Sequence, residues 1–245
     1  MNGATTGRPL ALVTGASRGL GLVISEFLAG EGYDLVVTAR GATALSAAAD
    51  RLAGARVSVT PVAGDVADEA HRARLGHAVR SRGRLDLLIN NASELGPSPL
   101  PPLEKLSLPA FERVLAVNLL APVALVQNLL PYLEVAQGTI VNISSDAAIG
   151  GYPGWGGYGA SKAALDLVSV TLAHELEGRG ISVVAVDPGD LRTTMHQAAY
   201  PGTDISDRPL PHVTVPFWAW LIHQDRRAVS GRRFQAQAER WEVPA

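Results

Sequence analysis

The sequence predicts a doubly wound α/β fold, and two patterns along its 245 residues carry that prediction. Apolar runs of strand length recur down the chain, and each is followed by a turn signal. Between them lie segments rich in Ala, Leu and Arg, in which apolar residues stand three and four positions apart, as in a helix that packs on one face. Strands that are apolar throughout belong to a parallel sheet with helices on both faces, and right-handed crossovers then give a Rossmann-like domain.

The individual elements follow in chain order. Strands are expected over residues 10–13, 34–38, 57–61, 85–89, 138–143 and 181–186. Helices are expected over residues 20–31, 67–82, 107–133 and 158–177, with a short aromatic helix around residues 216–223. No repeat or linker divides the chain, so a single domain over residues 1–245 is expected.

Residues 190–212 are the least regular part of the chain. Long loops in compact domains are usually functional, so we expect a substrate-binding loop and short helix over residues 190–223. Trp155, Trp218 and Trp220 either shape an apolar pocket or belong to the core or a subunit interface, and the second is the commoner place for an aromatic cluster.

Composition argues against several classes of function. With 47% hydrophobic residues the chain can bury a sizeable core, and without cysteine it has no disulfide or thiolate chemistry. A net charge of -2 without blocks of one sign argues against nucleic-acid or membrane-surface binding, and the six histidines lack metal-ligand spacing. Residues 1–10 lack the features of a secretory signal, and no stretch of about 18 uncharged apolar residues is expected to span a bilayer. We therefore expect a cytoplasmic protein without metal, nucleic acid or membrane partners.

Residues 14–21, TGASRGLG, follow the first predicted strand and open into a helix. Glycines in such a turn allow a pyrophosphate to approach the helix N-terminus, where free N–H groups and the helix dipole favour anions. The alternative is a plain tight turn, but the position after strand one of a βαβ unit favours a nucleotide site. The residues expected to bind the cofactor here are Thr14, Gly15, Ser17, Arg18, Gly19, Leu20 and Gly21.

Arg40 ends the second predicted strand, where the ligand of an open α/β sheet places its adenosine ribose. A guanidinium suits the 2′-phosphate of NADP, whereas a carboxylate would suit the ribose hydroxyls of NAD. Arg18 supplies a second cation to the same phosphate. NADP(H) is therefore expected rather than NAD(H), and the alternative is two solvated surface arginines in an arginine-rich chain.

Tyr158 and Lys162, in YGASK, place a phenol and an ammonium one turn apart on one helix face. A phenol with a pKa of about 10 is a poor base near neutrality, so its anion has to be stabilised. A positive charge about 5 Å away in a medium of dielectric constant about 20 contributes roughly 3 kcal/mol, or about 2 pKa units. The alternative, a packed tyrosine beside a solvated lysine, is disfavoured once the glycine turn is considered.

The joint pattern resembles the short, single-domain branch of the short-chain dehydrogenase/reductase family over nearly the whole chain. The resemblance implies a mostly parallel seven-stranded sheet in the order 3-2-1-4-5-6-7, and a homodimer or homotetramer that pairs the helices of residues 107–133 and 158–177. The matching residues are Thr14, Gly15, Gly19 and Gly21 of the TGxxxGxG loop; Asn90, Asn91, Ala92 and Ser93, where the family has NNAG; Asn118 in VNLLAP; Ser145, 13 positions before Tyr158; and the turn of Pro188 and Gly189.

The resemblance also implies roles. Tyr158 exchanges a proton with the substrate oxygen, Ser145 hydrogen-bonds that oxygen, and Lys162 lowers the tyrosine pKa and binds the nicotinamide ribose. Asn118 supports a water that links Lys162 to solvent. The remaining cofactor contacts that it implies are Asp65 with Val66 at the adenine, Asn91 and Ala92 along the cofactor, and Pro188, Gly189 and Thr193, of which Thr193 binds the carboxamide.

Three features depart from the family pattern: Ser93 in place of glycine, Asp190 after the Pro-Gly turn, and a C-terminal segment without the usual glycine-rich ending. The sequence nevertheless predicts an NADP(H)-dependent oxidoreductase that acts on a small carbonyl or secondary alcohol, with Tyr158 as the general acid–base. One alternative is a dinucleotide-binding regulator without turnover. Another is an epimerase or dehydratase that uses the hydride transiently, although such relatives resemble the longer branch of the family.

Overall fold

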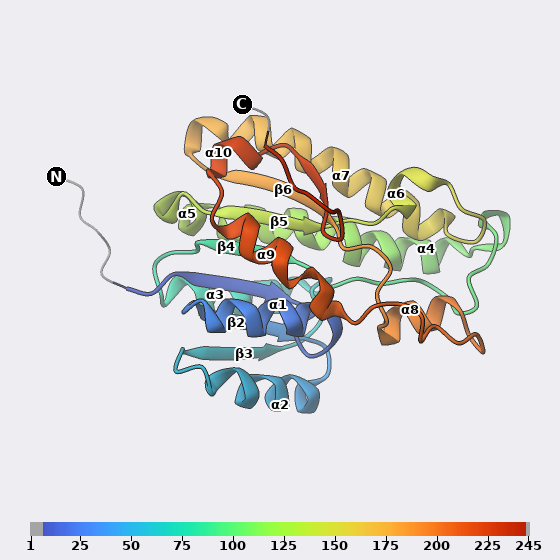
Figure 1. Cartoon of the computed structure of the whole chain (residues 1–245), viewed down its shortest axis with the longest axis horizontal. Helices are drawn as coiled ribbons and strands as arrows, with labels where there is room; N and C mark the ends of the chain where they lie inside the picture. The colour runs from blue at the N-terminus through green and yellow to red at the C-terminus, as the bar shows by residue number, and fades with distance from the viewer. Residues whose placement is uncertain (1–6, 244–245) are drawn as a thin grey trace.

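The structure, a computed structural model, describes residues 7–243, and its centre is a seven-stranded parallel sheet in the order β3-β2-β1-β4-β5-β6-β7 (Figure 1). The predicted order is confirmed, with the seventh strand at one edge. Residues 1–6 and 244–245 lie outside the described residues, and with them the ends of the expected domain and most of the segment considered for a secretory signal. The strands are β1 (Leu10–Thr14), β2 (Asp34–Ala39), β3 (Val59–Ala63), β4 (Leu87–Asn90), β5 (Thr139–Ile143), β6 (Ser182–Asp187) and β7 (Arg233–Gln235).

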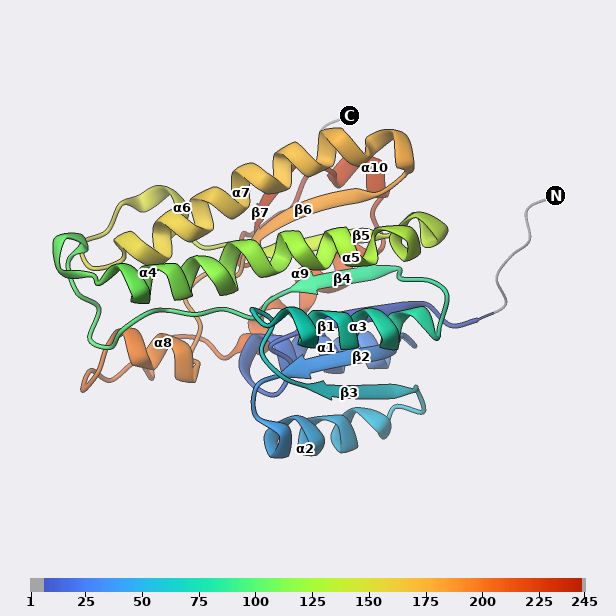
Figure 2. The ribbon, with the colours of Figure 1, turned by 180° about the vertical axis from the view of Figure 1, so that it is seen from behind.

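Helices cover both faces of the sheet, as predicted from its apolar strands. Figure 1 shows α1 (Gly19–Gly30) and α9 (Val215–Ile222) in front of the sheet, and these share one apolar core with α2 (Ala42–Ala53). Figure 2 shows the other face, where α3 (Glu69–Arg80), α5 (Ala121–Ala136) and α7 (Gly156–Leu176) enclose a second core. The shorter elements are η1 (Leu103–Lys105), α4 (Leu108–Leu115), the π-helical turn η2 (Ala116–Leu120), α6 (Ala147–Gly150), η3 (Glu177–Arg179), α8 (Thr194–Ala199), η4 (Pro211–Thr214) and α10 (Arg226–Val229).

Several element boundaries differ from the expected ones by one to three residues, and two of these differences have local reasons. The third strand begins at Val59 rather than at residue 57, and the Ser58 N–H just before it bonds to Oδ1 of Asp34 (2.8 Å). Pro61 is tolerated within β3 because the strand lies at the edge of the sheet. The helix expected from residue 67 begins at Glu69, since the Asp68 carboxylate accepts the N–H of Ala70 as an N-cap.

The helix expected over residues 107–133 is a continuous run of α4, η2 and α5, residues Leu108–Ala136. This run is long and apolar enough to cross a bilayer by length and composition, so the expectation that no stretch meets those criteria is wrong. Of its most apolar window, 44% is buried inside the protein. Leu125, Leu129 and Leu133 pack in the core between α3, α7 and the sheet, which accounts for the apolarity of this run as that of a core helix.

The segment expected to be irregular contains the short helix α8, which lies beyond the carboxyl ends of the strands (Figure 1). The aromatic helix α9 begins one residue earlier than expected and turns its rings inward. Trp218 is 2% exposed and donates its Nε1–H to Oγ1 of Thr214 (2.9 Å), while Trp220 packs against Phe217 and Trp241. The core interpretation therefore holds for Trp218 and Trp220.

Candidate active site

A cavity of about 1030 Å³ lies at the carboxyl ends of the parallel strands, where an open α/β sheet binds its ligands. Its walls come from the turn after β1, the ends of β2, β4, β5 and β6, the first turns of α7, and α8. This volume is at the upper end of the range for single small-molecule sites, about 300–1,000 Å³. The cavity is therefore large enough for an elongated ligand or for two ligands side by side.

Close packing of the turn after β1 explains its first glycine. Gly15 has a φ of 69°, and a Cβ there would lie 2.7 Å from Nδ2 of Asn91 and 3.0 Å from Cα of Ala92. The hydroxyl of Thr14 is buried and accepts the N–H groups of Asn91 and Ala92, both at 2.9 Å. Thr14 thus joins β1 to β4 from behind, and the residues after it form the cavity wall.

Three ion pairs lie at the cavity end next to β2 and β3, and one of them is a long contact of Arg113 Nε with Glu94 Oε2 (4.0 Å). Arg40 pairs with Glu94 (3.2 Å), and its side chain is 61% exposed. Asp65 pairs with Arg113, and it also accepts the N–H of Ala67 (2.9 Å). Burial acts to raise the pKa of Asp65, but the hydrogen bond from Ala67 and the Arg113 guanidinium outweigh it and hold the pKa below its usual value.

Tyr158 and Lys162 stand on the first turns of α7, on the wall of the same cavity. Lys162 Nζ lies 5.5 Å from the centroid of the Tyr158 ring and donates to the carbonyl of Ile143 at 2.7 Å. The helix can reach this position because Gly159 packs directly on α6, where a Cβ would lie 2.5 Å from the carbonyl oxygen of Ala147. The spacing expected from the sequence is therefore present.

Burial strongly shifts the pKa values of Tyr158 and Lys162. It raises the pKa of Tyr158 to about 12, while hydrogen bonds with Ser93 and Ser145 act to lower it and the carboxylates of Asp187 and Asp146 act to raise it. It lowers the pKa of Lys162 to about 8, against the attraction of the Asp166 carboxylate. Burial of the phenol outweighs these two hydrogen bonds, so the pKa of Tyr158 lies above its ordinary value. The lowering of this pKa by Lys162, which the resemblance implies, stays a prediction.

Ser93 and Ser145 approach the phenol from two different strands. Ser145 follows β5, and its hydroxyl also contacts Asp146 Oδ1 (3.0 Å) and the N–H of Ala147 (3.2 Å). Ser93 follows β4 and donates to Oδ1 of Asn118 at 3.3 Å. The phenol therefore contacts two hydroxyl groups, one of them at the position where the family pattern has glycine.

Asn118 lies in the π-helical turn η2, and its side chain is fully used within the protein. Its Oδ1 accepts the N–H of Glu94 (2.7 Å), and its Nδ2 donates to the Glu94 carbonyl (2.9 Å) and to Ser161 Oγ (2.9 Å). Asn118 thus holds the segment after β4 against α7. It is 1% exposed and does not line the cavity.

Arg233 of β7 connects the elements under the site. Its guanidinium contacts the carboxylates of Asp166 on α7 (3.0 Å) and Asp187 at the end of β6 (3.1 Å), and donates to the main-chain carbonyl of Ser145 (2.9 Å). These three groups come from three different elements. Arg233 was not among the residues predicted from the sequence, because no local pattern distinguishes it from the other arginines of the segment.

Most of the residues expected at the site are brought together, and two are not. Thr14 and Asn118 lie behind the cavity wall and support it. Glu94 and Arg113 also line the cavity but were not predicted, because their partners are distant in the sequence. The expected residues that do line the cavity are Gly15, Ser17, Arg18, Gly19, Leu20, Gly21, Arg40, Asp65, Val66, Asn91, Ala92, Ser145, Tyr158, Lys162, Pro188, Gly189 and Thr193.

This arrangement fits a dinucleotide. The cavity is continuous from the glycine turn and the arginines beside it to the phenol of Tyr158. At Gly19 the chain lines the cavity with a φ of 59°, and only Thr193 lies within 4 Å of where a Cβ would stand. Because residue 19 is a glycine, it has no side chain of its own to obstruct a phosphate group that approaches the helix N-terminus.

Comparison with known proteins supports this interpretation of the cavity. A family model of short chain dehydrogenases matches residues 9–204. One relative is a rhamnolipids biosynthesis 3-oxoacyl-[acyl-carrier-protein] reductase of Pseudomonas aeruginosa, which is 34% identical over 90% of this chain and 87% of its own. Another is a D-threitol dehydrogenase of Mycolicibacterium smegmatis, which is 35% identical over 79% of this chain and 74% of its own. A short chain dehydrogenase of Shigella flexneri, solved in complex with NADP, superimposes with a TM-score of 0.87 at 29% identity and covers 94% of this chain and 97% of its own. The chain belongs to the short-chain dehydrogenase/reductase family, a family of oxidoreductases.

Proposed function

We propose that this chain is an NADP(H)-dependent oxidoreductase that interconverts a small carbonyl compound and its alcohol, with Tyr158 as the general acid–base. The proposal rests on one observation: the glycine turn and Tyr158 line the same cavity, and Lys162 Nζ lies 5.5 Å from the centroid of the phenol ring. A bound NADP(H) supplies or accepts the hydride at the carbonyl carbon. The chain's own residues then have to bind, orient and exchange one proton.

During reduction, Tyr158 donates its proton to the carbonyl oxygen as that oxygen becomes an alkoxide. A pKa of about 12 keeps the phenol protonated, and therefore ready to donate, throughout the physiological pH range. In oxidation the phenolate has to form, and the ammonium of Lys162 with the positive charge of an oxidised nicotinamide favours it. Ser145 orients the substrate oxygen toward the phenol.

The proton that Tyr158 loses has to be replaced from solvent. We place Lys162 and a water at Asn118 on that route. Because the Asn118 side chain is bonded to Glu94 and Ser161, the water is held by the main chain of η2 in this proposal. A π-helical turn at this point agrees with the frequent occurrence of such turns at functional sites.

The preference for NADP(H) over NAD(H) rests on Arg40 and Arg18, which line the end of the cavity next to β2. Arg40 has to exchange Glu94 for the 2′-phosphate, and the exposure of this ion pair makes the exchange inexpensive. Arg40→Ala is expected to lower kcat/KM with NADPH about tenfold or more and to leave that with NADH little changed, because a hydrogen bond between charged groups contributes about 1.5–3 kcal/mol. Steady-state kinetics with both cofactors measures this.

The matched control is Arg51→Ala, which removes an arginine of α2 that pairs with Glu26 and does not line the cavity. Equal efficiency of the unmodified chain with NADH and NADPH would contradict the role of Arg40 and leave the oxidoreductase assignment intact.

The oxidoreductase assignment is tested with ketones, aldehydes, quinones and oxoacyl thioesters as substrates. Oxidation of NADPH that depends on one of these carbonyl compounds is expected, and its absence for every compound would contradict the assignment. We further propose a cytoplasmic enzyme that assembles as a homodimer or homotetramer through the continuous run of α4, η2 and α5 and through α7. Leu120 and Leu167, on the surface of this helical layer, are 60% and 68% exposed, and light scattering measures the assembly.

A further inference from the structure

Three aromatic side chains form one wall of the cavity beside the phenol. Trp155 precedes α7, and its ring meets that of Tyr158 edge to face, with centroids 5.7 Å apart at 70°. Tyr200 packs on Trp155 with centroids 6.2 Å apart, and His196 packs on Tyr200 at 5.2 Å. All of them line the cavity. We call Trp155, His196 and Tyr200 the aromatic wall.

The aromatic wall joins the segment after β6 to the helix that carries the phenol. His196 belongs to α8 and Tyr200 directly follows it, whereas Trp155 stands at the start of α7. The segment is fixed from its other side, because Ser98 Oγ donates to the carbonyl of Ala198 at 2.6 Å. A ligand that contacts the wall is thus held at a defined position relative to the hydroxyl of Tyr158.

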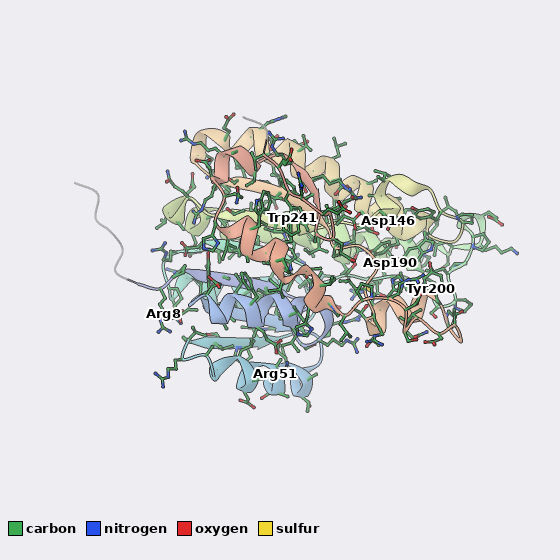
Figure 3. All side chains as sticks on the ribbon, viewed as in Figure 1. Arg8, Arg51, Asp146, Asp190, Tyr200 and Trp241 are labelled. Atoms are coloured by element: carbon green, nitrogen blue, oxygen red, sulfur yellow. The ribbon has the colours of Figure 1, made fainter. Side chains whose placement is uncertain are left out.

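Charge is distributed unevenly along the cavity. The lining arginines, Arg18, Arg40 and Arg113, all lie toward the glycine turn and the ends of β2 and β3, where Glu94 pairs with Arg40 and Asp65 pairs with Arg113. The carboxylates that line the cavity include Asp146 and Asp190, and Asp190 Oδ1 lies 4.0 Å from Nδ1 of His196 in the aromatic wall. Figure 3 shows Asp146, Asp190 and Tyr200 beyond the carboxyl ends of the strands.

The other charged groups near the aromatic wall do not make this end of the cavity positive. Asp187 lines the same end and is paired with Arg233, and Lys162 donates to a main-chain carbonyl of β5. Arg208 pairs with Asp190 (3.4 Å) but does not line the cavity. His196 of the aromatic wall is also titratable, and its Nδ1 lies 4.0 Å from Asp190 Oδ1.

Tyr152 also lines the cavity and lies within the field of these carboxylates. A hydrogen bond to Asp146 raises the pKa of Tyr152, and the negative charges of Asp146, Asp190 and Asp187 raise it further. A substrate carboxylate or phosphate at this position would meet the same repulsion. In contrast, a neutral aromatic ring gains favourable contacts with indole and phenol rings beyond those that follow from buried area alone.

We propose that the substrates are uncharged aryl carbonyl compounds and the corresponding benzylic alcohols, whose ring packs against Trp155 and Tyr200 while the carbonyl oxygen faces Tyr158. This inference rests on the proposed oxidoreductase function and goes further by naming the substrate class. It excludes carbonyl compounds whose anionic group would lie beside Asp146 and Asp190.

Three probe ketones separate the two parts of the proposal. Acetophenone carries the neutral aromatic ring, cyclohexyl methyl ketone has a saturated ring of similar size, and 4-acetylbenzoate adds a carboxylate to the aromatic ring. With NADPH, kcat/KM for acetophenone is expected to exceed that for each of the others by about tenfold. Saturation-transfer NMR with the three ketones, without turnover, should show the same order of binding.

Two variants assign the effects to residues. Tyr200→Leu, at an exposed position, is expected to reduce the preference for acetophenone over the saturated ketone about fivefold. Asp190→Asn is expected to raise the ratio of kcat/KM for 4-acetylbenzoate to that for acetophenone about fivefold. The matched control is Asp207→Asn, since Asp207 also pairs with Arg208 but does not line the cavity, and it should leave this ratio unchanged.

The possible failures are distinguishable. If cyclohexyl methyl ketone or 4-acetylbenzoate is reduced as well as acetophenone, the proposed substrate class is wrong and the oxidoreductase function stands. If no carbonyl compound is reduced, the proposed function is wrong. The NMR comparison still decides the ligand class in that case, because equal binding of the three ketones would overturn it.

Discussion

At the residue scale, burial and hydrogen bonds shift the pKa of Tyr158 in opposite directions, and residue spacing alone did not predict the outcome. Tyrosine and lysine four positions apart correctly predicted their distance, but burial raises the pKa of the phenol instead of leaving it lowered. The site thus favours proton donation, the step that reduction requires. Hydrogen bonds and positive charge have to offset burial before the phenolate forms for oxidation.

Ser93 provides one of those hydrogen bonds. In Ser93→Ala the pKa of Tyr158 should rise further, and the pH profile of alcohol oxidation should shift upward by about half to one unit, since one neutral hydrogen bond contributes about 0.5–1.5 kcal/mol. Rates of oxidation between pH 7 and 11 measure this shift. Ser81→Ala, a surface substitution at the end of α3, is the control, and an unshifted profile in Ser93→Ala would show that Ser93 does not act on the phenol.

The site residues that follow local patterns were predictable from the sequence. Gly15, Gly19, Tyr158 and Lys162 were identified because a turn or a helical turn fixes their spacing. The partners Arg40 and Glu94 are 54 residues apart, and no local pattern relates them. Long-range pairs of this kind depend on how the strand ends meet, which becomes visible only in the folded sheet.

At the scale of elements, the short strand β7 supports the site through Arg233. Without Arg233, the carboxylates of Asp166 and Asp187 lose their cation, and both are largely buried. Loss of one partner of a buried ion pair costs about 3–5 kcal/mol, so Arg233→Gln should lower Tm by roughly 10 °C and also reduce kcat, because Ser145 and Asp187 border the phenol.

Thermal unfolding and kinetics of Arg233→Gln should be compared with those of Arg232→Gln. The neighbouring Arg232 donates through Nε to the carbonyl of Ala228, so this control keeps both carboxylates paired. Equal Tm values for the two variants would show that the contacts of Arg233 do not stabilise the fold.

The elements themselves were largely predictable from sequence, since strands apolar along their whole length and helices of regular period require only local patterns. The exceptions have particular causes. The π-helical turn at Asn118 has no distinct period, and α8 is a single short helix within a segment that lacks hydrophobic periodicity. Trp218 and Trp220 belong to the core, whereas Trp155 lines the cavity. No signal in the sequence separates these two kinds of position.

At the scale of the whole molecule, the buried charge of Lys162 reduces the stability of the unliganded fold. Its pKa is about 8 in the folded chain against 10.5 for an unperturbed lysine. Below pH 8 both states hold the proton, so the cost of burying the charge is constant. Between pH 8 and 10.5 the unfolded chain retains the proton that the folded chain releases, and stability therefore rises with pH.

Lys162→Met removes this dependence. The variant should be more stable than the unmodified chain near neutral pH, and the difference in unfolding free energy should shrink by about 3 kcal/mol between pH 7 and 10. Urea unfolding of both proteins across this range measures this change. A difference that stays constant with pH would contradict the burial of a charged Lys162.

The most direct test of the account compares Tyr158→Phe with the unmodified chain in two measurements on the same samples, NADPH binding by fluorescence and carbonyl-dependent NADPH oxidation. The variant should bind NADPH with a Kd within about threefold, while kcat falls by about 10²–10⁴-fold, the usual contribution of general acid–base catalysis. Tyr132→Phe, which changes a tyrosine of α5 packed against the core, is the matched control. Undiminished turnover in Tyr158→Phe would contradict the assignment of proton transfer to this phenol.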